Sequence, residues 1–170
     1  NSVTVGKGAN SVTGNTVLGE NALDAAVTGQ YNTAIGNLAL TTNTSGLANT
    51  GVGYKALEDN TTGGLNTAVG QDALANNTTA SNNTGIGKSA LKENTTGTSN
   101  VALGGNALET NTTGNFNTGL GRQALYLNTT GTDNTAVGNQ ALRANTTASN
   151  NTAVGKTALV SNTTGASNTA

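Results

Sequence analysis

Residues 134–150, Asn-Thr-Ala-Val-Gly-Asn-Gln-Ala-Leu-Arg-Ala-Asn-Thr-Thr-Ala-Ser-Asn, decide the fold, because almost all of the chain repeats them. An asparagine opens each unit, and successive units begin 17 residues apart. A fixed period of this length is typical of a solenoid, in which each repeat packs on the next. We number the positions of a unit 1 to 17. The nine full units begin at Asn15, Asn32, Asn49, Asn66, Asn83, Asn100, Asn117, Asn134 and Asn151, and a further unit starts at Asn168.

Two positions carry a large aliphatic residue in every full unit, and they form the predicted core. Position 4 is Leu, Ile or Val and is always followed by glycine, whereas positions 8 and 9 are always Ala-Leu. The predicted core at position 4 is Leu18, Ile35, Val52, Val69, Ile86, Leu103, Leu120, Val137 and Val154. The predicted core at position 9 is Leu23, Leu40, Leu57, Leu74, Leu91, Leu108, Leu125, Leu142 and Leu159.

The composition indicates an ordered chain with a thin core. Leu, Ile, Val and Phe supply only 30 of the 170 residues, which borders on the composition of disordered proteins. Disordered chains of this kind also carry a high net charge, whereas the net charge here is −1. The strict period favours order, and the thin core predicts that stacking and partner chains contribute to stability. We expect the segment to be part of a longer protein.

Several functions are excluded or disfavoured by the residue types present. Without His or Cys, no nucleophile can be paired with an imidazole base, so we expect no catalytic residues and no enzyme. We expect no metal and no cofactor either, because acidic residues do not recur at the spacing of a calcium-binding roll. Charges of both signs on a weakly acidic chain argue against nucleic-acid binding. The sequence contains no run of 18 apolar residues, so we expect no membrane span in this segment.

Positions 1 to 5 predict one short β-strand per unit. Alternation along a strand places the usual Thr at position 2 and the aliphatic residue at position 4 on one face, which we expect to point into the coil. The opposite face carries Ala or Gly at position 3 and Gly at position 5. Such a face is poor in side chains, so it would allow close approach of a neighbouring subunit.

Positions 6 to 12 predict one to two helical turns. Of the 15 charged residues, 14 lie at positions 6, 7, 10 or 11, with Lys7 counted at position 6 of the short first turn and Asp133 as the exception. On a helix these positions share one face, and positions 8, 9 and 12 share the other. Strands stack at about 4.8 Å and helices at about 8–10 Å. Both therefore fit one stack only if the solenoid curves, the helix is a 3₁₀ turn, or strands of three chains interleave.

The first turn, within residues 1–14, is shorter than the units that follow over 15–170. Residues 1–6, Asn-Ser-Val-Thr-Val-Gly, resemble the Asn-Ser-Val-Ala-Ile-Gly motif of the YadA-like head domains of trimeric autotransporter adhesins, and Ser99 to Gly104 are a looser match. Similar arrays occur in bacterial surface fibres and phage tail fibres. The resemblance implies a left-handed parallel β-roll assembled as a homotrimer. The turn here is longer than usual for that family, and the extra residues follow the glycine.

Three further sets of residues have alternative interpretations. Asparagines at positions 1 and 12 predict hydrogen-bonded ladders, although Asn-Thr-Thr also fits the acceptor pattern for N-glycosylation. Bulky residues at position 17 predict subunit contact, with ligand binding as the alternative. The asparagines of the acceptor pattern are Asn60, Asn77, Asn94, Asn111, Asn128, Asn145 and Asn162. The bulky residues at position 17 are Tyr31, Leu65 and Phe116.

These observations favour a structural and adhesive segment of a trimeric surface fibre. Its place would be extracellular, at the cell surface or on a virion, and a host or matrix ligand is a possible partner besides the other two chains. A phage tail-fibre shaft is one alternative. An ice-binding or mineral-binding solenoid is another, because Thr pairs recur at positions 13 and 14 and would provide a regular array of hydroxyls.

Overall fold

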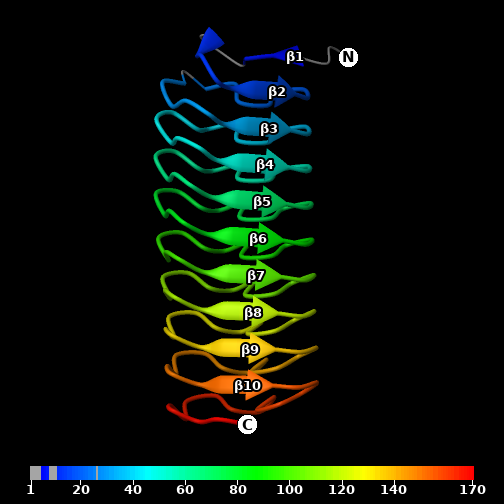
Figure 1. Ribbon diagram of the computed structural model, residues 1–170, viewed down its shortest axis with the longest axis vertical. Coiled ribbons are helices and arrows are strands. Elements are labelled where there is room, and N and C mark those ends of the chain that lie inside the picture. The colour runs from blue at the N-terminus through cyan, green and yellow to red at the C-terminus, as the bar shows by residue number, and fades with distance from the viewer. Residues whose placement is uncertain (1–4, 8–10, 26) are drawn as a thin grey trace.

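The computed structural model is a straight stack of similar turns, with β1 near one end and β10 near the other (Figure 1). It describes residues 5–7, 11–25 and 27–170. Each full unit contributes one three-residue strand at positions 2 to 4. The strands are β1 Val5–Gly6, β2 Thr16–Leu18, β3 Thr33–Ile35, β4 Thr50–Val52, β5 Thr67–Val69, β6 Thr84–Ile86, β7 Val101–Leu103, β8 Thr118–Leu120, β9 Thr135–Val137 and β10 Thr152–Val154.

Strands β2 to β10 form one parallel sheet in which each strand pairs with the next along the chain. The register joins equal positions of neighbouring units, so that Thr33 pairs with Thr50 and Ile35 pairs with Val52. Since every circuit of the chain adds one strand to the same sheet, the fold is a parallel β-solenoid with one short strand per 17-residue turn. The solenoid expected from the period is therefore confirmed.

Positions 6 to 11 form consecutive tight turns, and the prediction of a helix there is wrong. Residues at positions 7 and 9 have positive φ angles, for example 58° at Lys55 and 55° at Leu57. A right-handed helix needs negative φ at every residue. The turns place positions 6 and 7 outside, 8 and 9 inside, and 10 and 11 outside, as a helix would. For that reason the distribution of charges along the sequence did not distinguish the two structures.

The turns also remove the conflict between strand spacing and helix spacing. The backbone N–H of Leu40 donates to the carbonyl of Ala56, one unit further on, at 3.0 Å. In the Asn-Thr-Thr loop, Thr61 N–H donates to the carbonyl of Thr78 at 2.8 Å. The turns therefore hydrogen-bond to the neighbouring unit in the same way as the strands, and both have the same spacing along the stack. A curved solenoid, a 3₁₀ turn or interleaved chains are not needed to reconcile two different spacings.

The strand faces the opposite way from the prediction, so half of the predicted core is not inside the coil. Position 3 is the buried position, and Ala34, Ala68 and Ala102 are 0% exposed. The interior opposite the strand is filled by leucine, because a Cβ added to Gly51 would lie 3.4 Å from Leu40 Cγ. Only a small residue fits there. The position 4 residues, which point outward and are partly or largely exposed, are Leu18, Ile35, Val52, Val69, Ile86, Leu103, Leu120, Val137 and Val154.

The leucines at position 9 fill the centre of the coil. Leu23, Leu40, Leu57, Leu74, Leu91, Leu108, Leu125 and Leu142 are 0% exposed, and Leu159 in the last full turn is partly buried. Alanine at position 8 is buried beside them from Ala22 to Ala141. The hydrophobic core is therefore a single column of Ala-Leu pairs along the axis.

Two columns of buried asparagine flank the leucines. At position 12, Asn77 Nδ2 donates to Asn60 Oδ1 at 2.8 Å and to the carbonyl of Ala80 at 3.0 Å. At position 1, Asn66 Nδ2 donates to the same carbonyl at 2.8 Å, and its backbone N–H donates to Asn49 Oδ1 at 3.0 Å. The predicted ladders are therefore present in the structure. They satisfy buried polar groups that would otherwise oppose folding.

The first turn departs from the solenoid. Strand β1 pairs with β2 in the antiparallel sense, with Val5 opposite Leu18 and Gly6 opposite Val17. The expected roll turn at residues 2–14 includes residues 2–4 and 8–10, which lie outside the described residues. Where it is described, the short turn does not continue the parallel ladder. It also lacks the Ala-Leu pair that fills the coil in every later unit.

Candidate functional surfaces

The outward face of the sheet is the most regular surface of the molecule. Residues at positions 2 and 4 of nine successive strands point away from the coil, giving a column of threonine beside a column of aliphatic side chains, interrupted at position 2 by Val101. Several of the aliphatic residues are well exposed, with 47% for Leu103 and 61% for Val154. A continuous apolar column on an exposed sheet face is characteristic of an interaction surface.

Position 17 adds large side chains at the start of the strand. Tyr31, Leu65 and Phe116 are 67%, 57% and 61% exposed, respectively. In each unit the next residue is the buried asparagine and the one after it is the outward residue at position 2. The bulky residues therefore lie along the edge where the sheet face begins. The Tyr31 ring also covers Gly14 and lines a shallow pocket with Gln30 and Leu47.

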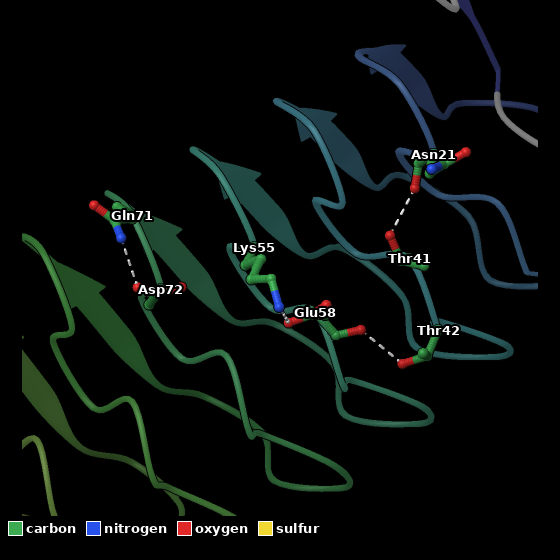
Figure 2. Close-up of polar contacts among 7 residues, drawn as sticks. All are labelled: Asn21, Thr41, Thr42, Lys55, Glu58, Gln71 and Asp72. Carbon is green, nitrogen blue, oxygen red and sulfur yellow. Dashed lines mark hydrogen bonds and ion pairs between the residues drawn. The ribbon is translucent and has the colours of Figure 1, made fainter.

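The charged positions lie on the side of the coil that faces away from the sheet, and we call positions 6, 7, 10 and 11 the turn face. Figure 2 shows part of it, where Lys55 Nζ lies 3.1 Å from Glu58 Oε2 and Gln71 donates to Asp72 at 2.9 Å. The hydrogen bond to the Glu58 carboxylate, together with its charge, raises the pKa of Lys55 above the ordinary value. These contacts are exposed, so they add little to stability.

Threonines at positions 13 and 14 do not form the double hydroxyl array that an ice-binding surface would need. Thr61 Oγ1 donates to the carbonyl of Thr78 at 3.0 Å, and Thr78 Oγ1 donates in turn to the carbonyl of Thr95. Position 14 is exposed, for example at Thr62. Only one hydroxyl per turn is therefore free in this loop.

The asparagines of the glycosylation pattern are enclosed by the fold. Asn60, Asn77, Asn94, Asn111, Asn128 and Asn145 are 0% exposed, and Asn162 in the last turn is partly exposed. The amide nitrogen of Asn94 already donates to Asn77 Oδ1 and to the carbonyl of Gly97. A glycan on such a nitrogen has no room in the folded coil, so the pattern reflects the ladder.

The part of the chain that the structure describes holds no group of three or more His, Cys, Asp or Glu residues arranged to bind a metal ion. Within the same residues, no helix is long and apolar enough to cross a membrane. The most regular exposed surfaces are the sheet face, the position 17 edge and the turn face. The sheet face was not predicted from the sequence, because positions 2 and 4 were expected to point into the coil. Position 3 is Ala or Gly in every full unit except the first, which has Val17, and this pattern was a signal that position 3 is the inward one.

No protein-family model, curated protein or solved structure matches this chain. The class is therefore defined by the fold alone, as a parallel β-solenoid repeat protein with asparagine ladders and an amphipathic outer sheet face.

Proposed function

We propose that the chain is a structural and adhesive shaft segment of a homotrimeric fibre outside the cell. The observation that carries the proposal is the column of aliphatic residues on the outward sheet face. It runs along nine strands of a straight stack, so a partner that matches it must share the same spacing over the same length. Another copy of the chain, aligned in parallel, meets that requirement at every turn.

The thin interior of the coil supports this assignment. Each turn has one buried leucine beside small alanines and asparagines, while the larger part of the remaining aliphatic surface is outside. Placing three sheet faces around a common axis would bury that surface at about 25 cal/mol per Å² of apolar area. The bulky side chains of Tyr31, Leu65 and Phe116 at the edge of the face would then fill the gaps between neighbouring chains.

The resemblance to YadA-like heads supports the same assembly, since it implies a left-handed roll in a surface-exposed trimer. A shaft of a phage tail fibre has the same physical requirements and differs only in where the fibre is attached. In both settings the repeat number sets a length. The exposed loops would then be available to a host or matrix ligand.

The assembly is tested with the pair of changes Ile86→Lys and Leu103→Lys, which places two charges on the sheet face. The matched control is Thr96→Lys and Thr113→Lys, which places the same charges in the same two units at exposed position 14. Light scattering should report a trimer for the unmodified chain and the control, and a folded monomer for the sheet-face variant. A stable folded monomer of the unmodified chain at micromolar concentration would overturn the proposal.

Ice binding is the second candidate, and it now rests on the sheet face. The hydroxyl groups of Thr67, Thr84 and Thr118 make no hydrogen bond within the described part of the chain, and they recur beside the aliphatic column at the strand spacing of about 4.8 Å. Ice binding needs this face open, whereas a trimer covers it. Thermal hysteresis of the monomeric form would favour ice binding, and its absence together with a trimeric mass would exclude it.

A further inference from the structure

The turn face lies on the opposite side of the coil from the sheet face. Leu40 packs against the inner side of the strand, so the outward side chains that flank it in the turn segment point away from the sheet. A trimer built on the sheet faces would therefore leave the turn face uncovered. Its charges remain to be explained.

Six of the charges on the turn face form three pairs of opposite sign that are arranged symmetrically about the middle of the array. At position 10 the two central units, which begin at Asn83 and Asn100, carry Lys92 and Glu109. Glu58 and Arg143 occupy the same position two units further out on each side.

A third pair lies one unit out from the centre, at the neighbouring positions 6 and 7. Asp72 is in the unit that begins at Asn66, and Arg122 is in the unit that begins at Asn117. All three pairs therefore share one midpoint between the units at Asn83 and Asn100.

We propose that two copies of the chain pair side by side and antiparallel through their turn faces, about a two-fold axis at this midpoint. Such an axis places each position of the turn opposite the same position of the partner and reverses the order of the units. Glu58 then meets the other copy's Arg143, and Asp72 meets its Arg122. Parallel pairing in register would instead bring each unit against the same unit of the partner. Arg122 and Arg143 would then meet no carboxylate, because each is the only charge on the turn face of its unit.

The remaining charges of these units meet uncharged residues in the antiparallel arrangement. Lys156 faces Asn37, and Lys88 faces Gly105. The other facing pairs are Lys55 with Gln140, Asp59 with Ala144, and Glu93 with Thr110. No like charges face each other at equal positions, but Glu93 and Glu109 lie at the neighbouring positions 11 and 10 of facing units. The register therefore has three favourable pairs against one unfavourable pair, all doubled by symmetry.

Apart from Glu58, which forms an ion pair with Lys55, the outer charges have no ionic partner within the described part of their own chain. Among the described residues, Arg143 and Arg122 have no carboxylate partner, and Asp72 is bound only by the neutral amide of Gln71. The Arg143 guanidinium lies 5.5 Å from the centre of the Tyr126 ring, and its Nε is buried without a hydrogen-bond partner. The ring holds this cation in place on the turn face, ready for an acceptor from outside.

Charge reversal tests the pairing. Sedimentation equilibrium in about 20 mM salt should show self-association that weakens in about 300 mM salt, because exposed ion pairs are screened. Arg143→Glu and Glu58→Arg should each lower the association constant by about tenfold, since each creates two like-charge contacts in the dimer. The double variant, which swaps both charges, should restore it.

Lys156→Glu is the matched control, because it makes the same change of charge at a residue that faces neutral Asn37. It should leave the association constant unchanged. An equal loss of association in the Lys156→Glu control would show that net charge causes the effect. If the double variant did not recover the association constant, the Glu58–Arg143 contact would be excluded. Either result overturns the proposal.

Cysteine crosslinking tests the direction of the pairing in a chain that has no cysteine of its own. Thr41 and Val160 share position 10 and face each other in the proposed dimer. A mixture of Thr41→Cys and Val160→Cys chains should form the mixed disulfide in preference to either homodimer. Predominant 41–41 disulfides would show parallel pairing and refute the inference. Arg143→Glu should not change the mass of a trimer formed through the sheet faces, because Arg143 lies on the turn face. The experiment can therefore show that one of the two proposals fails while the other holds.

Discussion

Asn60 donates its side-chain amide to Oδ1 of Asn43, 2.8 Å away and one full unit earlier in the chain. The same nitrogen donates to the carbonyl of Gly63 in its own turn at 3.0 Å. Each amide at position 12 therefore joins its own loop to the preceding one, and the pattern continues to Asn162. Because the members from Asn43 to Asn145 are buried and hydrogen-bonded, the ladder holds the units in one register as well as stabilising them.

Removing one member of the ladder should be costly. Asn94→Ala leaves the buried Asn77 Oδ1 without a donor. It also removes one of the two hydrogen bonds made by the carbonyl of Gly97 and one of the two made by Asn111 Nδ2. We expect a loss of roughly 2–4 kcal/mol in the free energy of unfolding, measured by urea denaturation. Asn139→Ala is the control, because the side chain of this partly exposed residue makes only one long hydrogen bond, to the carbonyl of Arg122 at 3.4 Å, and it should change the free energy of unfolding by less than about 0.5 kcal/mol. A tolerated Asn94→Ala would show that the ladder contributes no net stability.

The glycine at position 5 should not accept a side chain. Gly87 has a φ of 130°, and a Cβ there would lie 2.6 Å from the carbonyl carbon of Gly104 in the next unit. Gly87→Ala should therefore disrupt the strand ladder locally and cost about 3 kcal/mol or more. Gly105→Ala is the control, because a Cβ at that glycine meets nothing within 4 Å. Amide exchange should rise around residues 84–104 only in the Gly87 variant.

The buried and outward positions of one unit should respond differently to substitution. Leu91→Asp places an unpaired carboxylate in the 0% exposed column and should cost several kcal/mol, on the order of 4. Lys88→Ala removes an exposed charge and should change stability by less than about 0.5 kcal/mol. Thermal unfolding followed by circular dichroism measures both. Similar losses in the two variants would mean that the inside of the turn has been misidentified.

The array should tolerate the loss of a whole unit but not of part of one. Deleting residues 83–99 joins equivalent positions and keeps both asparagine ladders in register, so the variant should fold with a modestly lower stability. Deleting residues 83–91 removes one strand and its Ala-Leu pair and leaves the following loop without a matching turn. Its circular dichroism spectrum should lose strand signal, and proteolysis should cut near the junction. Equal resistance of the two deletions would contradict a unit-by-unit stack.

The sequence alone determined the architecture and the buried positions of the turn segment. A strict 17-residue period predicted the solenoid, the invariant Ala-Leu pair was correctly placed inside, and the asparagines at positions 1 and 12 were correctly expected to form ladders. These inferences succeeded because each turn stacks on a near copy of itself. A residue type that suits one turn then suits every turn, so the pattern of repetition reports the environment directly.

The tertiary structure decided the direction of the strand and the conformation of positions 6 to 11. The alternation of Ala68 and Val69 along the strand is compatible with either residue pointing into the coil. The leucine column leaves room only for a small residue, so Ala68 points inward and Val69 points outward. The turn conformation likewise depends on hydrogen bonds such as that from Leu74 N–H to the carbonyl of Ala90 in the next unit. Both choices depend on contacts between units, and local sequence preferences do not contain that information.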